Sequence, residues 1–401
     1  MALEVVKNSD EFKRFVTKAK EIKNYKEPIG FGIARVDRGQ KNSEKILQAT
    51  YPIINWNENF GSAAVFIASL NECGICVDFN KDEFVTDVTR EFVLNTMNAF
   101  APFLNEAVGE EHKNVQVIKH INELFATDTI GDKSYKVVFI FEDKAPKSVE
   151  SVYLKLYALS TSKADLRSLN LNGAFGILEN VAWSGNNPIE LEWLRENEIS
   201  LKLDAKYPEI NSVDKFPRFL QHIIPASNTR ILETSKVRMG AQLHSGTTVM
   251  PGASYINFNA GTTGPVMVEG RISSSAIVGS GSDVGGGASI LGVLSGTDGN
   301  PISIGENTLL GANSVTGVPL GDGCIVDAGV TILEGTKVTI STEEFNKIKD
   351  ANPNWDANDT DVFKGGVLAD LNGVHFRQDS ITGTIKAFRS TREVKLNEEL
   401  H

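Results

Sequence analysis

The stretch MVEGRISSSAIVGSGSDVGGGASILG, Met267 to Gly292, repeats two kinds of residue with a period of six. Large aliphatic residues recur at Ile272, Val278, Val284 and Ile290. The fourth residue after the first three of these is small in each case: Ala276, Ser282 and Ala288. A two-position rule inside a period of six is a repeat signal that neither a helix nor an ordinary strand produces. The stretch therefore predicts a left-handed parallel β-helix.

The same period extends on both sides of this stretch. The other members at the large position, all aliphatic or β-branched apart from one tyrosine, are Val237, Leu243, Val249, Tyr255, Val266, Ile304, Leu310, Thr316, Leu320, Val326, Ile332 and Val338. The other small members are Ala241, Thr247, Ala253, Thr308, Ser314, Cys324, Val330 and Thr336. Three six-residue sides close one triangular coil, and each coil bonds to the next at about 4.8 Å. We therefore expect a β-helix domain at residues 237–340.

The period breaks in two places, at Asn257–Pro265 and at Gly292–Pro301. Both segments are rich in Gly and Asn, which favour turns. We expect both to leave the prism as loops, where binding sites often lie on a rigid scaffold.

The remaining chain predicts two further regions. In residues 1–230, strand-like runs such as Tyr135–Phe141 alternate with helical ones such as Phe84–Phe103, after a first helix capped by Ser9. This pattern indicates a mixed α/β region, and it contains no Gly-x-Gly-x-x-Gly or Walker loop for a nucleotide. In residues 341–401, an acidic linker precedes the strand-like Gly373–Ser380, which we interpret as a short C-terminal β cap.

Composition excludes several partners and sites. The formal net charge is −11, whereas binding to nucleic acid or anionic lipid usually depends on clustered Lys and Arg. The sequence has neither an apolar run long enough for a membrane helix nor a signal-peptide pattern, so we expect a cytoplasmic protein. The Cys73–Cys76 pair lacks a second ligand pair to complete a zinc site, and we expect two plain thiols.

The tripeptide Glu269-Gly270-Arg271 is the candidate for chemistry. Counting the repeat from Val266 places Gly270 inward, so its two charged neighbours are expected to point out of the prism. One coil later, Glu269 is expected beside Gly287 and Arg271 beside Ser289. The glycines at 285–287 leave that face without side chains, which permits close approach of a ligand or of another subunit.

Several segments resemble the tetrahydrodipicolinate N-succinyltransferase family, in its longer form with a large N-terminal domain. They are GAQLHSGTTVM, INFNAGTTGPVMVEGRI, VGSGSDVGGGASILGVLSG, ISIGENTLLGANS and LNEELH. The resemblance implies transfer of succinyl from succinyl-CoA to the amine of ring-opened tetrahydrodipicolinate, on the route to lysine and diaminopimelate. It also implies a homotrimer with its active sites between adjacent β-helices.

The resemblance further implies residue roles. Glu269 is implied as the catalytic group, through an acyl anhydride. The implied succinyl-CoA contacts are Arg271, Gly286, Ser289, Ala312, Asp327, Ala328, Gly335, Lys364, Arg377, Gln378, Asp379 and Ser380. From the residues themselves, an ionised Glu269 could attack the thioester or could take a proton from the attacking amine. Arg271 could hold a carboxylate by a bidentate pair, and Lys364 and Arg377 could attract anionic CoA.

Other hypotheses remain open beside this one. Succinyl-CoA is expected as a co-substrate, with no tightly bound cofactor. Some relatives carry acidic magnesium ligands in the early coils. Residues 234–268 of this chain contain no Asp or Glu, which argues against a magnesium site there. His244 is a rival catalytic base. The alternatives for the whole protein are a hexapeptide-repeat acyltransferase with another acyl-CoA or amine, including a nucleotide sugar, and a non-catalytic β-helix scaffold.

Overall fold

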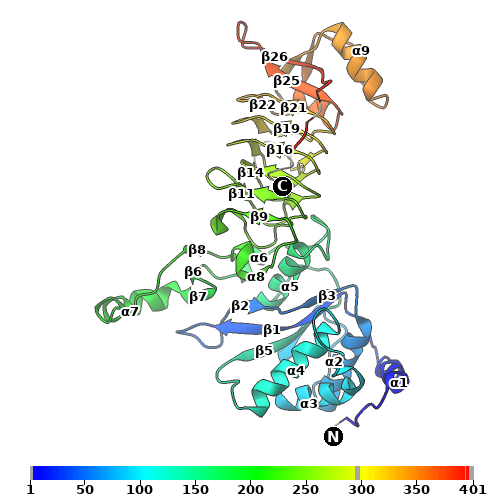
Figure 1. The fold of residues 1–401 in the computed structure, drawn as a ribbon, viewed down its shortest axis with the longest axis vertical. Helices are drawn as coiled ribbons and strands as arrows, with labels where there is room; N and C mark the ends of the chain where they lie inside the picture. The colour runs from blue at the N-terminus through cyan, green and yellow to red at the C-terminus, as the bar shows by residue number, and fades with distance from the viewer. Residues whose placement is uncertain (1–2, 294–298, 393, 397–401) are drawn as a thin grey trace. The chain divides into compact units, whose positions relative to one another are not determined.

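The computed structural model describes residues 3–293, 299–392 and 394–396 (Figure 1). The chain divides into two compact units. Residues 1–158 and 169–216 form the first, which we call the N-terminal unit. Residues 159–168 and 217–401 form the second, which we call the β-helix unit. The domain limits near 230, 237 and 340 stay a prediction.

The N-terminal unit is built on a sheet with the strand order β2-β1-β5-β4, in which β3 also pairs with β1. Helices α2, α3 and α4 cover one face of it, and α5 covers the other (Figure 1). The core between sheet and helices is rich in phenylalanine, such as Phe31, Phe66 and Phe139. The elements are α1 (Ser9–Ala19), β1 (Gly30–Arg38), β2 (Ile46–Thr50), β3 (Ile54–Trp56), α2 (Phe60–Glu72), β4 (Glu83–Asp87), α3 (Arg90–Ala99), α4 (Lys113–Ala126), β5 (Ser134–Ile140) and α5 (Val149–Ser160).

A smaller antiparallel sheet completes this unit. Its strand order is β7-β6-β8, and a long helix connects β7 to β8. The elements are α6 (Ala174–Ile177), β6 (Val181–Ser184), β7 (Asn187–Glu190), α7 (Leu191–Leu203) and β8 (Ser212–Asp214). Trp183 of β6 is fully buried and its indole N–H donates to the Asp214 carbonyl at 3.0 Å.

Two local predictions for the N-terminal unit need correction. Asn8, not Ser9, caps the first helix, because the Asn8 side chain accepts from the backbone N–H groups of Asp10 and Glu11. The run Phe84–Phe103 is not one helix: Phe84 lies in β4, and α3 begins at Arg90 after the N-cap Thr89. The strand predicted at 135–141 is confirmed as β5.

The β-helix unit confirms the predicted fold class. Short parallel strands stack into three sheets, one for each side of the prism. The first side consists of β9 (Arg230–Ile231), β10 (Thr248–Val249), β13 (Met267–Val268), β16 (Asp283–Val284), β19 (Leu309–Leu310) and β21 (Ile325–Val326). The second consists of β11 (Tyr255–Ile256), β14 (Arg271–Ile272), β17 (Ser289–Ile290), β20 (Val315–Thr316) and β22 (Thr331–Ile332). The third consists of β12 (Gly261–Thr262), β15 (Ile277–Val278) and β18 (Ser303–Ile304).

The segment Asn257–Pro265 is not a loop that leaves the prism, contrary to the prediction. Its residues Gly261 and Thr262 form β12, which pairs with β15 on the third side. The inward positions there hold Ala260 and Thr262, both fully buried, and the Thr262 hydroxyl lies 2.7 Å from the Thr247 hydroxyl. The prediction failed because this side of the coil carries no large aliphatic residue at its inward positions.

The sides of the prism are also less uniform than predicted. Ile256 rather than Tyr255 is buried on the second side, seven residues after Val249. The wall residue before Ile272 is Val268, paired with Val284, and not Val266. Val268 and Ile272 are therefore four residues apart, whereas Val284 and Ile290 in the next coil are six apart. The tripeptide at 269–271 thus forms a shortened corner.

The second expected loop, Gly292–Pro301, lies partly outside the described residues. Register places Ser303 of β18 beside Ile277, 26 residues earlier, whereas Ile325 of β21 is 16 residues after its partner Leu309. This coil is therefore ten residues longer than the 16-residue coil between β19 and β21, and eight longer than the 18-residue coil between β14 and β17.

The C-terminal segment is a β cap, as predicted. Strand β25 (Val374–Gln378) continues the first side by pairing in parallel with β21. It then pairs with β26 (Ile385–Arg389), which is followed in the sheet by β23 (Lys337–Thr339) and β24 (Val362–Lys364). Helix α9 (Thr342–Ala351), which the sequence did not reveal, packs on β26.

Candidate functional site

One corner of the prism gathers most of the predicted site residues. Val268, Val284, Leu310, Val326 and Phe376 are register partners in five successive strands of the first side. The residue after each of them stands at the corner, so these residues stack in one line that we call the site column. Its members are Glu269, Gly285, Gly311, Asp327 and Arg377. Four strand spacings of about 4.8 Å give the column a length of roughly 19 Å.

Glu269 lies at the start of the site column, on the shortened corner. Its side chain is half-buried, and no described residue hydrogen-bonds or ion-pairs with its carboxylate, Arg271 included. Its main chain is held by the next coil: the Glu269 N–H donates to the Val284 carbonyl at 2.8 Å, and the Gly287 N–H donates to the Glu269 carbonyl at 3.3 Å. The register places Glu269 level with Gly285 and not with the predicted Gly287, because Val268 pairs with Val284 in the shortened corner. The hydrogen bond from Gly287 still holds Glu269 against the triple glycine.

Gly270 explains how the short corner closes. It is buried, and a methyl group at this position would meet the Ala288 carbonyl oxygen at 2.4 Å. Since two backbones approach this closely, only glycine fits. Gly286 differs: a methyl group there would lie 3.6 Å from Glu269 Oε2, with no other close neighbour. The glycine corner therefore leaves room directly beside the glutamate carboxylate.

Arg271 lies beside Ser289, as the register predicted. The two residues are strand partners, and the Arg271 Nε donates to the Ser289 hydroxyl at 3.2 Å. Arg271 is exposed and lines a groove of about 440 Å³ together with Lys236, Tyr255 and Gly287. Lys236 donates to the Gly252 carbonyl at 2.7 Å on the same groove. Two cations therefore border the space beside the short corner.

A second row of predicted residues runs along the same corner. Gly286, Ala312 and Ala328 each stand two residues after an inward residue of the first side. The Asn313 N–H donates to the Gly286 carbonyl at 3.0 Å, and the Gly329 N–H donates to the Ala312 carbonyl at 2.9 Å. These small residues and the glycines of the site column leave a path along the corner that large side chains do not block.

Asp327 is the most highly bonded member of the site column. Its carboxylate accepts from Arg377 Nε at 2.6 Å and lies 2.7 Å from His375 Nε2. Burial raises the pKa of Asp327, but the hydrogen bonds from Arg377 and His375 outweigh it and hold the pKa below its ordinary value. His375 is not among the site residues predicted from the sequence. His375 and Arg377 are two residues apart in β25, so their side chains lie on the same face of the strand. This spacing is the sequence feature that could have pointed to His375.

A basic stripe crosses the cap. Lys364 is the register partner of Lys337, and Lys386 is the partner of Arg377 across β25 and β26. Thr339, two residues after Lys337, pairs with Lys386, so the four cations share one face of the sheet. No described residue forms an ion pair with Lys337 or Lys364. Like charges directly opposite each other destabilise a sheet, which favours a site for an anion.

The structure separates the other predicted contacts. Gly335 lies three residues after Ile332, at another corner of the prism. It is close to Lys364 in space, because the Gly366 N–H donates to the carbonyl of Glu334, the residue before Gly335, at 3.0 Å. Gln378 donates to the Gly383 carbonyl at 3.1 Å. Asp379 bonds to Lys386 at 2.6 Å and to turn N–H groups, which lower its pKa. Ser380 is exposed in the same turn.

The rival base His244 lies at a different corner from Glu269. The preceding Gln242 bridges to Gly261 of the third side, and the His244 N–H donates to the Thr262 hydroxyl at 3.3 Å. Among the described residues, no group of three or more His, Cys, Asp or Glu side chains could hold a metal ion. None of the described helices combines the length and the apolar character needed to cross a membrane.

Three family descriptions match the chain. "Tetrahydrodipicolinate N-succinyltransferase N-terminal" matches residues 10–176, and "Tetrahydrodipicolinate N-succinyltransferase middle" matches residues 178–218. "Hexapeptide repeat of succinyl-transferase" matches residues 301–334. The N-terminal unit therefore carries a family signal that its residues alone had not revealed.

Relatives agree over the full length. A protein of Sulfurovum sp. named 2,3,4,5-tetrahydropyridine-2,6-dicarboxylate N-succinyltransferase is 68% identical over 401 residues, which is 100% of both chains. The protein of the same name from Campylobacter jejuni is 56% identical and covers 99% of this chain and 100% of its own. A crystal structure of a putative 2,3,4,5-tetrahydropyridine-2-carboxylate N-succinyltransferase from Campylobacter jejuni matches with a TM-score of 0.91 and 55% identity, covering 98% of this chain and 100% of that one.

Proposed function

Because the chain belongs to the tetrahydrodipicolinate N-succinyltransferase family, we propose that it transfers a succinyl group from succinyl-CoA to the amine of ring-opened tetrahydrodipicolinate. The products are N-succinyl-2-amino-6-oxopimelate and CoA, and the reaction serves lysine and diaminopimelate synthesis. The full-length relatives that carry this name support the proposal.

The observation that carries the proposed site is the state of Glu269. A half-buried carboxylate that no described residue hydrogen-bonds or pairs with has a lone pair available for chemistry. A structural glutamate at this depth would normally have a partner, because leaving a buried charge unpaired is costly. The open space beside Gly286 is where the thioester carbon would reach the carboxylate. We assign Glu269 as the catalytic residue.

Two reaction routes are consistent with this position. In the first, a Glu269 oxygen attacks the thioester carbon, CoA leaves as the thiolate, and the substrate amine then attacks the resulting mixed anhydride and releases the carboxylate. In the second, Glu269 takes a proton from the substrate ammonium, the free amine attacks the thioester carbon, and Glu269 gives this proton to the CoA thiolate as the C–S bond breaks. In both routes the ammonium loses two protons in all, one to the CoA thiolate and one to solvent, so Glu269 ends the turnover ionised.

CoA would lie along the site column, with its acyl end at Glu269. The small residues Gly286, Ala312 and Ala328 leave the corner accessible to an extended arm. The phosphates would reach the basic stripe of the cap, with Lys337 and Lys386 adding to the predicted Lys364 and Arg377. Arg271, oriented by Ser289, would hold a terminal carboxylate of the succinyl group or of the acceptor.

We further propose a cytoplasmic homotrimer without a resident cofactor. The exposed corner with its bare glycines offers a surface that a neighbouring β-helix can approach. The acid-free tract at residues 234–268 supports the absence of a magnesium site in the early coils. Sedimentation of the purified protein would measure the subunit number directly.

The assay of the proposed reaction follows thiol release from succinyl-CoA with and without tetrahydrodipicolinate. We expect release that depends on the acceptor, and a much lower rate with acetyl-CoA, which lacks the carboxylate for a cation to hold. Rapid quench followed by mass spectrometry would detect a succinylated Glu269 on the anhydride route. Acceptor-independent release, or equal rates with both donors, would contradict the proposal.

A further inference from the structure

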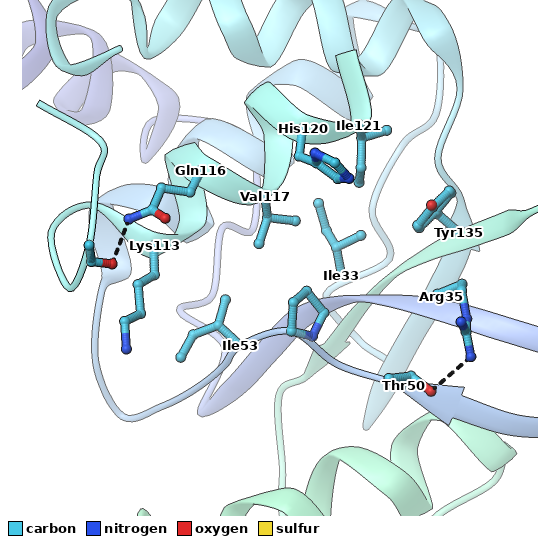
Figure 2. A pocket seen from close by; sticks show the side chains of 12 residues that line it. Ile33, Arg35, Thr50, Ile53, Lys113, Gln116, Val117, His120, Ile121 and Tyr135 are labelled. Atoms are coloured by element: carbon cyan, nitrogen blue, oxygen red, sulfur yellow. Dashed lines mark hydrogen bonds between the residues drawn. The ribbon is translucent and has the colours of Figure 1, made fainter. Parts of the chain in front are cut away.

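A second site candidate lies in the N-terminal unit, in a groove between α4 and the sheet (Figure 2). The groove has a volume of about 630 Å³, which is within the range of roughly 300–1,000 Å³ typical of small-molecule sites. It takes its lining from β1, β2, α4 and β5, from the segment after β2, and from Gly109 in the segment before α4. It contains none of the residues that we assign to succinyl transfer.

Helix α4 turns one face towards this groove. Lys113, Gln116, Val117, His120 and Ile121 recur at three- and four-residue spacings and line it, so they share one side of the helix. Val115, Ile118 and Ile121 of α4 are buried in the phenylalanine core, and Val117 packs against it. The groove therefore lies at the edge of this core, where Val117 and Ile121 contribute to both.

One end of the groove is a polar row across three strands. Tyr135, Arg35 and Thr50 are register partners on β5, β1 and β2. The Arg35 Nη2 donates to Asp37 at 2.9 Å and to the Thr50 hydroxyl at 3.4 Å, which fixes the guanidinium. Its Nε is buried and has no hydrogen-bond partner. The Arg35 side chain as a whole is 41% exposed, so a ligand in the groove would meet the terminal nitrogens of the guanidinium and not the buried Nε.

The other end carries a second cation. Lys113 and Gln116 stand there, beyond Val117 and away from Arg35 (Figure 2). Lys113 pairs with Glu110 at 2.5 Å, but the Glu110 side chain is 87% exposed and does not line the groove. His120 faces the middle and has Glu123, also outside the lining, at 3.7 Å. The groove lining contains three basic side chains and no acid.

Between its two ends the groove is apolar. Ile33, Pro52, Ile53, Val117 and Ile121 form this middle part, and Ile33 and Ile121 are each 3% exposed. Ligand sites combine an apolar lining with a few placed polar groups. An apolar middle with a cation at each end therefore fits a ligand that has an apolar middle and an anion at each end. We propose that this groove binds a linear dicarboxylate with an apolar spacer, one carboxylate at Arg35 and the other at Lys113.

The test uses octanedioate as the probe and the full-length protein. Ligand-observed NMR titration gives its dissociation constant, and octanoate, with one carboxylate, serves as the charge control. We expect octanedioate to bind more tightly than octanoate, and Arg35→Gln and Lys113→Gln each to weaken octanedioate about tenfold, as the loss of a charge-assisted hydrogen bond implies. Val117→Trp, which fills the apolar middle, should abolish binding.

Lys119→Gln is the matched control, because Lys119 lies on the same helix but does not line the groove. It should leave the dissociation constant unchanged. Circular dichroism confirms that each variant is folded. Equal affinity for octanedioate and octanoate, equal weakening by Lys119→Gln and Lys113→Gln, or undiminished binding to Val117→Trp would each overturn the proposal.

Discussion

A pair of glycine substitutions separates the fold of the short corner from its chemistry. In Gly270→Ala the added methyl group would lie 2.4 Å from the Ala288 carbonyl oxygen and 2.9 Å from the Gly285 carbonyl oxygen. Both neighbours are backbone atoms inside stacked coils, so neither can yield without moving a coil. Overpacking of this kind costs about 3 kcal/mol. We expect the thermal midpoint of the variant to fall by several degrees, measured by circular dichroism.

Gly286→Ala is the matched partner. Its methyl group would have Glu269 Oε2 at 3.6 Å as its nearest contact, which is an ordinary van der Waals distance. The midpoint should therefore stay within the error of the wild type, whereas turnover in the thiol-release assay should fall, because the methyl group occupies space beside the glutamate carboxylate. A Gly270→Ala protein as stable as the wild type would refute the close stacking of this corner. A fully active Gly286→Ala protein would refute the position of the acyl group.

Three further predictions follow from the site column and its surroundings. Asp327→Asn should raise the KM for succinyl-CoA, because Arg377 loses the partner that holds it in place. Folding lowers the pKa of Asp327, so its carboxylate stabilises the fold above the unfolded-state pKa of about 3.9, and this stabilisation is lost as the pH falls through the folded-state pKa. The urea midpoints of the variant and the wild type should therefore converge in acid. Lys337→Gln and Lys364→Gln should each raise the KM for succinyl-CoA about threefold to tenfold with little change in kcat, since each would remove one cation that binds a CoA phosphate. An unchanged KM would contradict the proposal that the basic stripe binds the phosphates. Burial raises the pKa of Cys324 to about 11, so at pH 8 a thiol reagent should modify the exposed Cys76 quickly and Cys324 only on unfolding, as mass spectrometry would show.

The sequence predicted the β-helix because aliphatic residues on its inner walls recur at a fixed step. The prediction was right where a wall residue is aliphatic, as at Val278, Val284 and Ile290, all fully buried. It was wrong on the side that contains β12, where the inward residues are the small Ala260 and the polar Thr262. Thr262 is hydrogen-bonded to Thr247 and carries no hydrophobic signal.

The site was predicted unevenly for a related physical reason. The position of Ser289 beside Arg271 followed from counting along the repeat, and the register confirms it. The same count placed Glu269 beside Gly287, whereas the shortened corner places it level with Gly285. His375, Lys337 and Lys386 did not follow, because their places beside Asp327, Lys364 and Arg377 depend on pairing between distant strands. Lys337 and Lys364 meet only because β23 and β24 are antiparallel, and no local pattern encodes that register.

The central claim is that Glu269 performs the chemistry, and Glu269→Gln tests it most directly. The amide keeps the size of the side chain but removes its charge and its nucleophilicity. Measured with saturating succinyl-CoA and tetrahydrodipicolinate, kcat should fall at least a hundredfold, the usual scale for loss of a catalytic acid or base. The thermal midpoint and the affinity for CoA should stay unchanged. A kcat within a few-fold of the wild type would contradict the account.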